Sequence, residues 1–133
     1  KKRGIDSEIF WIGNKPIRGC IDCKSCWGKG RCIFDDDSVN ECIQKIIAAD
    51  GVIVGSPVYF GGMPGSLKCQ KERVFYDSKR QFSYKQAPAV VTCRRGGAIR
   101  LMADNMAWLL HSGEASGVTP FEREVRVKTN FYK

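Results

Sequence analysis

The sequence predicts a doubly wound α/β protein, a three-layer α/β/α arrangement with a parallel sheet between two layers of helices. Two short unbroken apolar runs, at 51–55 and 89–93, are typical of parallel strands that are buried on both faces. Stretches with helical spacing of apolar residues alternate with them, which implies right-handed crossovers and helices on both sides of the sheet. Only three strands are predicted where an open sheet of this class has about five, so we expect parts of the sheet to be missing.

The first half of the chain predicts one strand, one cysteine-rich loop and one helix. The segment Ser7–Ile12 is aromatic and β-branched, as expected of a strand. A cysteine-rich loop follows over residues 19–32. Ser38 and Glu41 then fit a capping box, and apolar residues at helical spacing predict a helix that runs to about Ala49.

The second half predicts two further strands and two further helices. A strand over residues 51–55 precedes a loop that begins at Ser56, and a helix with a thin apolar stripe is expected over residues 66–76. Residues 89–93 predict the third strand. A last helix, rich in Leu and Met from position 101, is expected to end near position 113.

Length and composition predict one incomplete domain over residues 1–133, with residues 113–133 as a C-terminal tail. A chain of 133 residues with 43% apolar content can build a single hydrophobic core. No run approaches the roughly 20 apolar residues that cross a bilayer, and the Lys-Lys-Arg start lacks a signal peptide's hydrophobic run. We therefore expect a cytoplasmic protein without a membrane partner.

The charge and the cysteine count narrow the function classes further. The net charge of +8 comes from basic residues scattered among acidic ones without a groove-reading motif, so no nucleic-acid partner is expected. Some of these cations could attract cofactors that carry phosphate. Seven cysteines is an odd number, and four of them fall within thirteen positions, which favours metal or redox chemistry over a secreted disulfide framework.

Two loops are expected to form a ligand site, because ligands of doubly wound sheets bind outside the carboxyl ends of the strands. The first loop joins aromatic rings to glycines and prolines and could wall a flat heteroaromatic ring; its candidate residues are Ser56, Pro57, Val58, Tyr59, Phe60 and Gly61. The second could hold a phosphate or a ring carbonyl through Arg94, Arg95, Gly96 and Gly97. An ordinary aromatic turn and an exposed arginine pair are the alternatives.

Four cysteines in one compact loop are candidate metal ligands: Cys20, Cys23, Cys26 and Cys32. Four closely spaced thiolates can ligate a [4Fe–4S] cluster. The loop is more compact than most paired-knuckle zinc sites, although zinc and unligated thiols both remain open as alternatives.

At these residues the chain resembles the NAD(P)H-dependent FMN reductase family of flavodoxin-like proteins, including its iron–sulfur flavoprotein branch. The resemblance rests on the cysteine loop, on Asp35-Asp36-Asp37, on residues 49–61, on Arg94–Gly97 and on Asn105–Leu110. It implies a flavodoxin-like fold, with FMN contacted by the ten candidate loop residues. It also implies NAD(P)H as the electron donor and, by analogy with the iron–sulfur branch, a [4Fe–4S] cluster on the four cysteines.

Two departures from the family pattern qualify this resemblance. Family members begin with a strand and a loop that grips the FMN phosphate, and they carry a further strand segment between the Arg-Arg-Gly-Gly turn and the last helix. This sequence shows neither of these segments. Without the phosphate loop, FMN would lose its main charged anchor, and we expect this form of the chain to be empty of flavin as it is prepared.

The predicted function is that of an FMN-dependent oxidoreductase of the NAD(P)H:FMN or NAD(P)H:acceptor reductase type. Flavin accepts hydride and can release electrons singly or in pairs, so the protein mainly binds and orients it. The acceptor is expected to be a small molecule or a protein, and the resemblance implies a homodimer or a higher homo-oligomer. A non-enzymatic flavodoxin-like electron carrier and a metal-binding regulatory module are the alternatives.

Overall fold

The computed structural model describes residues 4–77, 82, 85 and 87–104. Its elements follow the order α1 (Val39–Ala48), β1 (Val54–Pro57), α2 (Gly65–Asp77) and β2 (Ala89–Thr92). Residues 98–104 are also helical. The alternation of strands and helices that the sequence predicts is therefore confirmed within this part of the chain.

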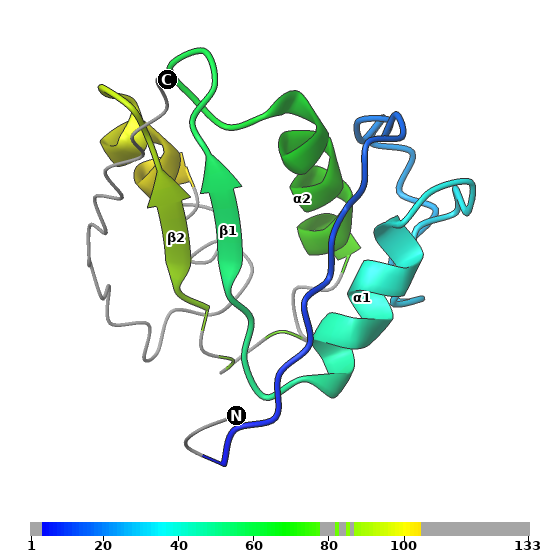
Figure 1. Ribbon diagram of the computed structural model, residues 1–133. Coiled ribbons are helices and arrows are strands. Elements are labelled where there is room, and N and C mark those ends of the chain that lie inside the picture. Colours follow the sequence, from blue (N-terminus) through cyan, green and yellow to red (C-terminus); the bar gives the residue numbers. More distant parts are fainter. Residues whose placement is uncertain (1–3, 78–81, 83–84, 86, 105–133) are drawn as a thin grey trace.

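The two strands form a parallel pair connected through α2. Val54 pairs with Ala89 and Pro57 with Thr92, and both arrows point the same way in Figure 1. A main-chain bond from Val58 N to Thr92 O, 2.8 Å long, continues the pairing past the strand ends. A strand, a crossover helix and a parallel strand form the βαβ unit from which doubly wound sheets are built.

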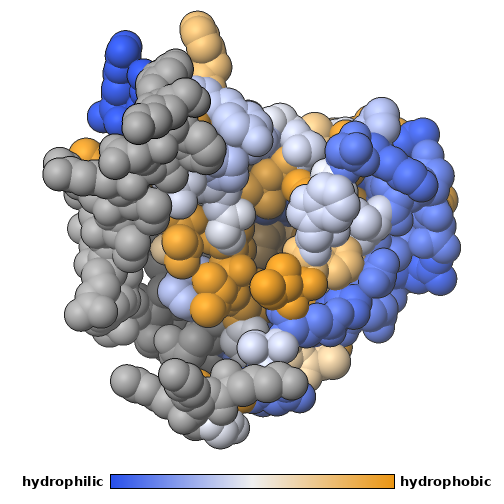
Figure 2. Space-filling model, viewed as in Figure 1, coloured by the Kyte–Doolittle hydropathy of each residue, from blue (hydrophilic) through white to orange (hydrophobic). Residues whose placement is uncertain are grey.

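The observed strands differ from the prediction in position and burial. β1 begins three residues later than the apolar run that predicted it, and it includes Ser56, which was assigned to the loop. Burial on both faces is wrong for the described chain, because Ser56 and Val91 are buried whereas Ile53 and Val90 are 70% and 44% exposed. Figure 2 shows apolar surface on the face of the molecule over these strands. The described part of the chain covers only one face of the pair.

The predicted strand at residues 7–12 is wrong. These residues are irregular and largely exposed, with Ile9 94% and Trp11 75% accessible. The segment runs beside the helices in Figure 1, and its side chains contact α1: Glu8 pairs with Lys45, whose ammonium lies 6.0 Å from the ring centre of Phe10. An aromatic, β-branched stretch becomes a strand only where a neighbouring edge accepts its hydrogen bonds.

The helices match their predicted bounds closely, but α1 is capped differently. Ser38 makes no side-chain cap; its hydroxyl donates to Gln70 Oε1 at 3.3 Å. Asp37 Oδ1 instead accepts a 3.1 Å bond from the N–H of Val39. Ser38 is therefore the N-cap residue as predicted, but the capping-box bond is wrong, and the Asp37 carboxylate accepts the N–H of Val39 in its place, at the positive end of the helix dipole.

Two hydrophobic clusters hold the described chain together. The first lies between α1 and α2 and contains Val39, Ile43, Val74, Phe75, Phe82 and Cys32. The second joins β2 to the helix at 98–104 through Val91, Ala98 and Leu101, with Val58 and Met63 packed against it. The second half of the last predicted helix and the predicted tail at 113–133 lie outside the described residues. Among the helices of the described chain, none is long and apolar enough to cross a membrane.

Candidate functional site

The two predicted ligand loops meet at the carboxyl ends of β1 and β2. A Cβ atom on Gly97 would lie 2.8 Å from Val58 Cγ1 and 3.1 Å from the carbonyl carbon and oxygen of Gly61. Gly97 has φ +92°, which favours glycine in any case. The backbones of the two loops are thus in direct contact, and two segments separated along the chain form one edge of the sheet.

The aromatic side chains of the first loop face solvent. Phe60 is fully exposed and Tyr59 is 75% exposed, while Tyr59 N donates to Gly62 O at 3.3 Å across a turn. Arg94 and Arg95 of the second loop are exposed as well. The arrangement presents rings and guanidinium groups beside closely approaching main chain, which is a suitable wall for a planar, hydrogen-bonding ring.

Some of the ten predicted flavin contacts have side chains that are already engaged. Ser56 is buried, and its hydroxyl donates to Pro57 O at 2.9 Å. Val58 packs against the second hydrophobic cluster. The structure brings the predicted residues together at one edge, and their contact with flavin stays a prediction.

The four predicted cysteine ligands line a single pocket. Cys26 and Cys32 are buried, Cys20 is partly buried and Cys23 is exposed; none forms a disulfide. The loop turns tightly because Asp22 and Lys24 adopt positive φ values of 52° and 56°. Such a backbone conformation in a residue other than glycine costs about 1 kcal/mol or more, and it persists only where the surrounding structure imposes it.

The donor set of this pocket fits an iron–sulfur cluster. Four cysteine thiolates are the usual ligands of a [4Fe–4S] cluster. Within the described chain, no three His, Cys, Asp or Glu side chains gather as ligands of one metal ion. Each cysteine of a [4Fe–4S] cluster binds a different iron, and the four thiols along one pocket match such a cluster in the type and number of donors, so the cluster stays a prediction.

Hydrogen bonds adjust the acidity of groups around the cysteine pocket. Bonds with the main chain and the hydroxyl of Ser25 lower the pKa of the Cys23 thiol, which favours the thiolate that binds metal. The Tyr76 hydroxyl donates to Asp22, and this bond, with some desolvation and the nearby negative charge, raises the pKa of Tyr76 to about 12. Tyr76 therefore stays protonated at neutral pH.

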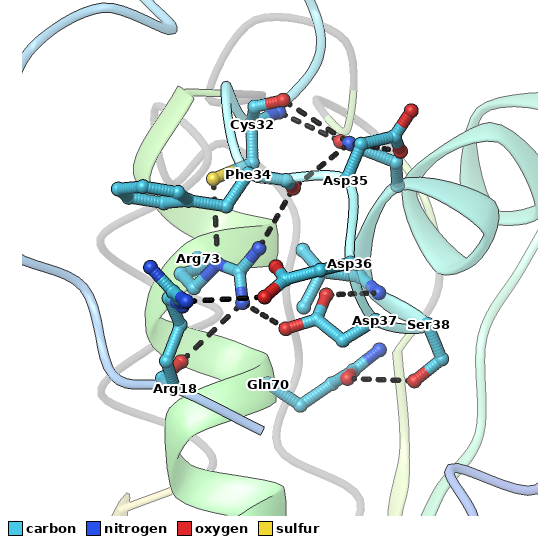
Figure 3. A network of polar contacts seen from close by, with 11 residues as sticks. Arg18, Cys32, Phe34, Asp35, Asp36, Asp37, Ser38, Gln70 and Arg73 are labelled. Carbon is cyan, nitrogen blue, oxygen red and sulfur yellow. Dashed lines mark hydrogen bonds and ion pairs between the residues drawn. The ribbon is translucent and has the colours of Figure 1, made fainter. Parts of the chain in front are cut away.

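Arg73 of α2 is a buried polar residue of this region to which sequence reasoning gave no role. It is 3% exposed, and its guanidinium lies among Cys32, Phe34, Asp37 and Arg18 in Figure 3. Nε donates to Cys32 Sγ at 3.3 Å, Nη2 to Phe34 O at 3.0 Å and Nη1 to Arg18 O at 3.4 Å. Nη1 also pairs with the buried Asp37 carboxylate. The only signal in the sequence is that polar residues interrupt the apolar face of α2. This interruption is interpreted as weak support for the helix and not as a sign of a buried polar residue.

Asn40 of α1 is the second residue that sequence reasoning missed. Its Oδ1 accepts from Cys32 N at 2.7 Å, and its Nδ2 donates to Cys32 O at 3.1 Å and to Phe34 O at 3.2 Å. Nδ2 also donates to Asp35 at 2.8 Å, and this bond lowers the pKa of the Asp35 carboxyl, with Arg31 adding to the effect. Asn40 therefore fixes the main chain at Cys32, the last cysteine of the loop, and just after it.

A parallel βαβ unit whose two loops meet at the carboxyl ends of its strands is the building unit of a doubly wound α/β protein. The sequence profile of the NADPH-dependent FMN reductase family matches residues 1–120, and the chain belongs to this family. The predicted fold class and the predicted family are both confirmed.

Relatives in the curated proteins include several iron–sulfur flavoproteins. One from Methanosarcina thermophila is 32% identical over 113 residues, which is 82% of this chain and 59% of the relative. One from Methanocaldococcus jannaschii is 42% identical over 72 residues, 54% of this chain and 37% of the relative. One from Clostridioides difficile is 31% identical over 94 residues, 71% of this chain and 42% of the relative. The chain thus spans between about a third and three fifths of these relatives.

Proposed function

We propose that the chain is the FMN- and cluster-binding part of an oxidoreductase that takes electrons from NAD(P)H. The observation that carries this proposal is the contact between the loops after β1 and β2, where a Cβ on Gly97 would meet Val58 and Gly61. Membership of the FMN reductase family and the names of the relatives support the flavin and the cluster. When bound, FMN supplies hydride acceptance and the cluster supplies one-electron transfer.

The residues of the two loops bind and orient the ring in this proposal. Tyr59 and Phe60 offer exposed aromatic faces for stacking, and the glycines at 61 and 97 let main-chain N–H groups approach the edge of the ring. Arg94 and Arg95 place positive charge beside it, which favours a ring that gains negative charge on reduction. A wall for a planar ligand would thus be built from main chain and a few side chains.

The four cysteines of the pocket hold the cluster in this proposal. Two of them are buried and one is exposed, so the site is shielded on the protein side and open on the other. The acceptor is a small molecule or a protein, and the functional unit is a homodimer or a higher homo-oligomer. Nucleic acid and membrane have no part in it.

The test is reconstitution of the full chain under anaerobic conditions with FMN, ferrous iron and sulfide. We expect quenching of FMN fluorescence, about four irons per chain, and oxidation of NADH or NADPH with a small quinone as acceptor. Flavin binding without oxidation of either nucleotide would indicate an electron carrier instead. Iron binding without flavin affinity would indicate a metal-binding regulatory module.

Two cysteine variants give a matched control for the cluster. Cys32→Ser removes a thiol that lines the pocket and should abolish stable iron binding. Cys42→Ser changes a partly buried thiol of α1 that lies outside the pocket lining, and burial raises the pKa of Cys42, which makes it a poor ligand. The Cys42 variant should keep its iron. Equal loss in both would contradict the assignment of the pocket cysteines.

A further inference from the structure

We propose that Arg73 is a positioning residue that raises the reduction potential of the cluster through its hydrogen bond to the sulfur of Cys32. This inference rests on the proposed function, because it needs a cluster on the four cysteines. The bond runs from Nε to Sγ over 3.3 Å, and both residues are buried, at 3% and 8% exposure. The guanidinium therefore contacts a proposed ligand atom directly, on the buried side of the pocket.

The guanidinium is fixed by three acceptors that lie on both sides of the cysteine loop. Arg18 O lies before the cysteine loop, Phe34 O lies after it, and the Asp37 carboxylate lies at the start of α1. Each of its three nitrogens is engaged, as Figure 3 shows. Because the planar fork cannot rotate without breaking several of these bonds, Nε is held toward Cys32.

Charge and hydrogen bonding at the sulfur both stabilise the reduced cluster. Reduction adds one negative charge to the cluster and its thiolates. A donor and a positive charge at a ligand sulfur stabilise that added charge, and a buried site screens the interaction less than water does. Asp37 offsets part of the charge, but its carboxylate pairs with Nη1 while Nε donates to the sulfur. The net effect is a higher potential.

Asn40 is the comparison residue that separates an effect on the reduction potential from a purely structural effect on the loop. It bonds to the main-chain N and O of Cys32, whereas Arg73 bonds to the sulfur. Both side chains are buried and both hold the same residue. A change at Asn40 should therefore affect how well the loop holds iron, and a change at Arg73 should affect how easily the bound cluster is reduced.

The experiment is an EPR-monitored redox titration of the full chain, loaded anaerobically with ferrous iron and sulfide, as wild type, Arg73→Lys and Asn40→Ser. Lysine keeps the charge that pairs with Asp37 but lacks the fork that also reaches the sulfur. At the wild-type midpoint potential, we expect the ratio of reduced to oxidised cluster in Arg73→Lys to fall about tenfold, which is about 59 mV for a one-electron couple. Asn40→Ser should lower iron per chain and leave this ratio, in the loaded fraction, within about twofold.

A second variant keeps the inference testable if Arg73→Lys does not bind iron. Arg73→Gln/Asp37→Asn removes both buried charges together, so neither is left unpaired, and its potential should fall in the same direction. The inference is overturned if the loaded Arg73 variants stay within twofold of wild type, if Asn40→Ser shifts the ratio equally, or if both Arg73 variants lose iron that wild type retains. Failure of wild type itself to take up iron would overturn the proposed cluster as well.

Discussion

The cysteine pocket and the paired loops are positioned by opposite means. The pocket is held by buried polar side chains, above all Arg73 and Asn40, which bond to the residues around Cys32. The paired loops are held by the absence of a side chain, because the backbone at Gly97 touches that at Gly61. The geometry of the cysteine pocket depends on particular polar side chains, and the geometry of the paired loops depends on the lack of a side chain at glycine.

This difference suits the two kinds of ligand that we propose for the two regions. A cluster is held by covalent bonds to sulfur, so its protein ligands need fixed positions and a controlled charge environment. A flavin is held by stacking and by main-chain hydrogen bonds, so its site needs exposed rings and close backbone. Three kinds of substitution therefore test the comparison: removal of a buried charge, a side chain added at a glycine, and removal of an exposed ring. We expect the loss of folding stability to decrease in that order.

The largest loss of stability is expected from Arg73→Met. The substitution leaves the Asp37 carboxylate buried without its cation, and breaking a buried ion pair in this way lowers the free energy of unfolding by about 3–5 kcal/mol. Urea unfolding followed by circular dichroism measures the change. Arg31→Met is the control, because its pair with Asp35 is exposed on both sides and should contribute less than about 1 kcal/mol. Equal losses would show that burial of the Arg73 network does not matter.

The second effect is expected at Gly97. In Gly97→Ala the new methyl group would meet Val58 and Gly61 at 2.8 and 3.1 Å, at a φ of +92° that alanine disfavours. We expect a loss of about 2–3 kcal/mol in unfolding free energy and a large loss of FMN affinity, since the loops must separate. Gly96→Ala has open space around the added atom and should change stability by less than about 1 kcal/mol. Unchanged FMN affinity in Gly97→Ala would place the flavin elsewhere.

The sequence predicted those features that depend on local pattern. Apolar patterns located α1, α2, β1 and β2 within a few residues, and the two loops selected by their composition do meet at one edge of the sheet. It could not predict that residues 7–12 fail to form a strand, because strand formation depends on a distant edge. It also could not assign Arg73 and Asn40, since their partners lie up to 55 and 8 residues away along the chain. Buried polar networks of this kind are tertiary features, and sequence patterns treat their members as surface residues.

Lys71 is a second buried cation on α2, the helix that also carries Arg73, and it tests how much burial of a charge affects stability there. Lys71 is 4% exposed, and burial lowers its pKa to about 8, with Asp104 acting in the opposite sense. At pH 7 both the folded and the unfolded chain carry the proton, so folding bears the cost of burying the charge, less what nearby groups such as Asp104 offset. Between pH 8 and about 10.5 the folded chain loses the proton while the unfolded chain keeps it, and this cost is relieved.

Lys71→Met should therefore be more stable than wild type by about 1 kcal/mol at pH 7, with the advantage shrinking as the pH rises toward 10.5. Urea unfolding of both proteins at several pH values measures this difference, and effects of other titrating groups largely cancel between them. Lys68→Met, at an exposed position of the same helix, should change stability by less than about 0.5 kcal/mol. An advantage that grows with pH would contradict the burial of a charged Lys71.

The smallest effect on stability, and the sharpest separation of binding from folding, is expected at Phe60. Its side chain is fully exposed, so Phe60→Ser should change the free energy of unfolding by less than about 0.5 kcal/mol. If the ring stacks on FMN, the same substitution should weaken FMN binding about tenfold, which is about 1.4 kcal/mol. Fluorescence titration measures the affinity, and Trp11→Ser, at a 75% exposed ring on the irregular segment beside α1, serves as the control without an effect on FMN. Loss of affinity in the Trp11 variant alone would move the flavin away from the paired loops, because only one of these two rings lies at the carboxyl ends of the strands.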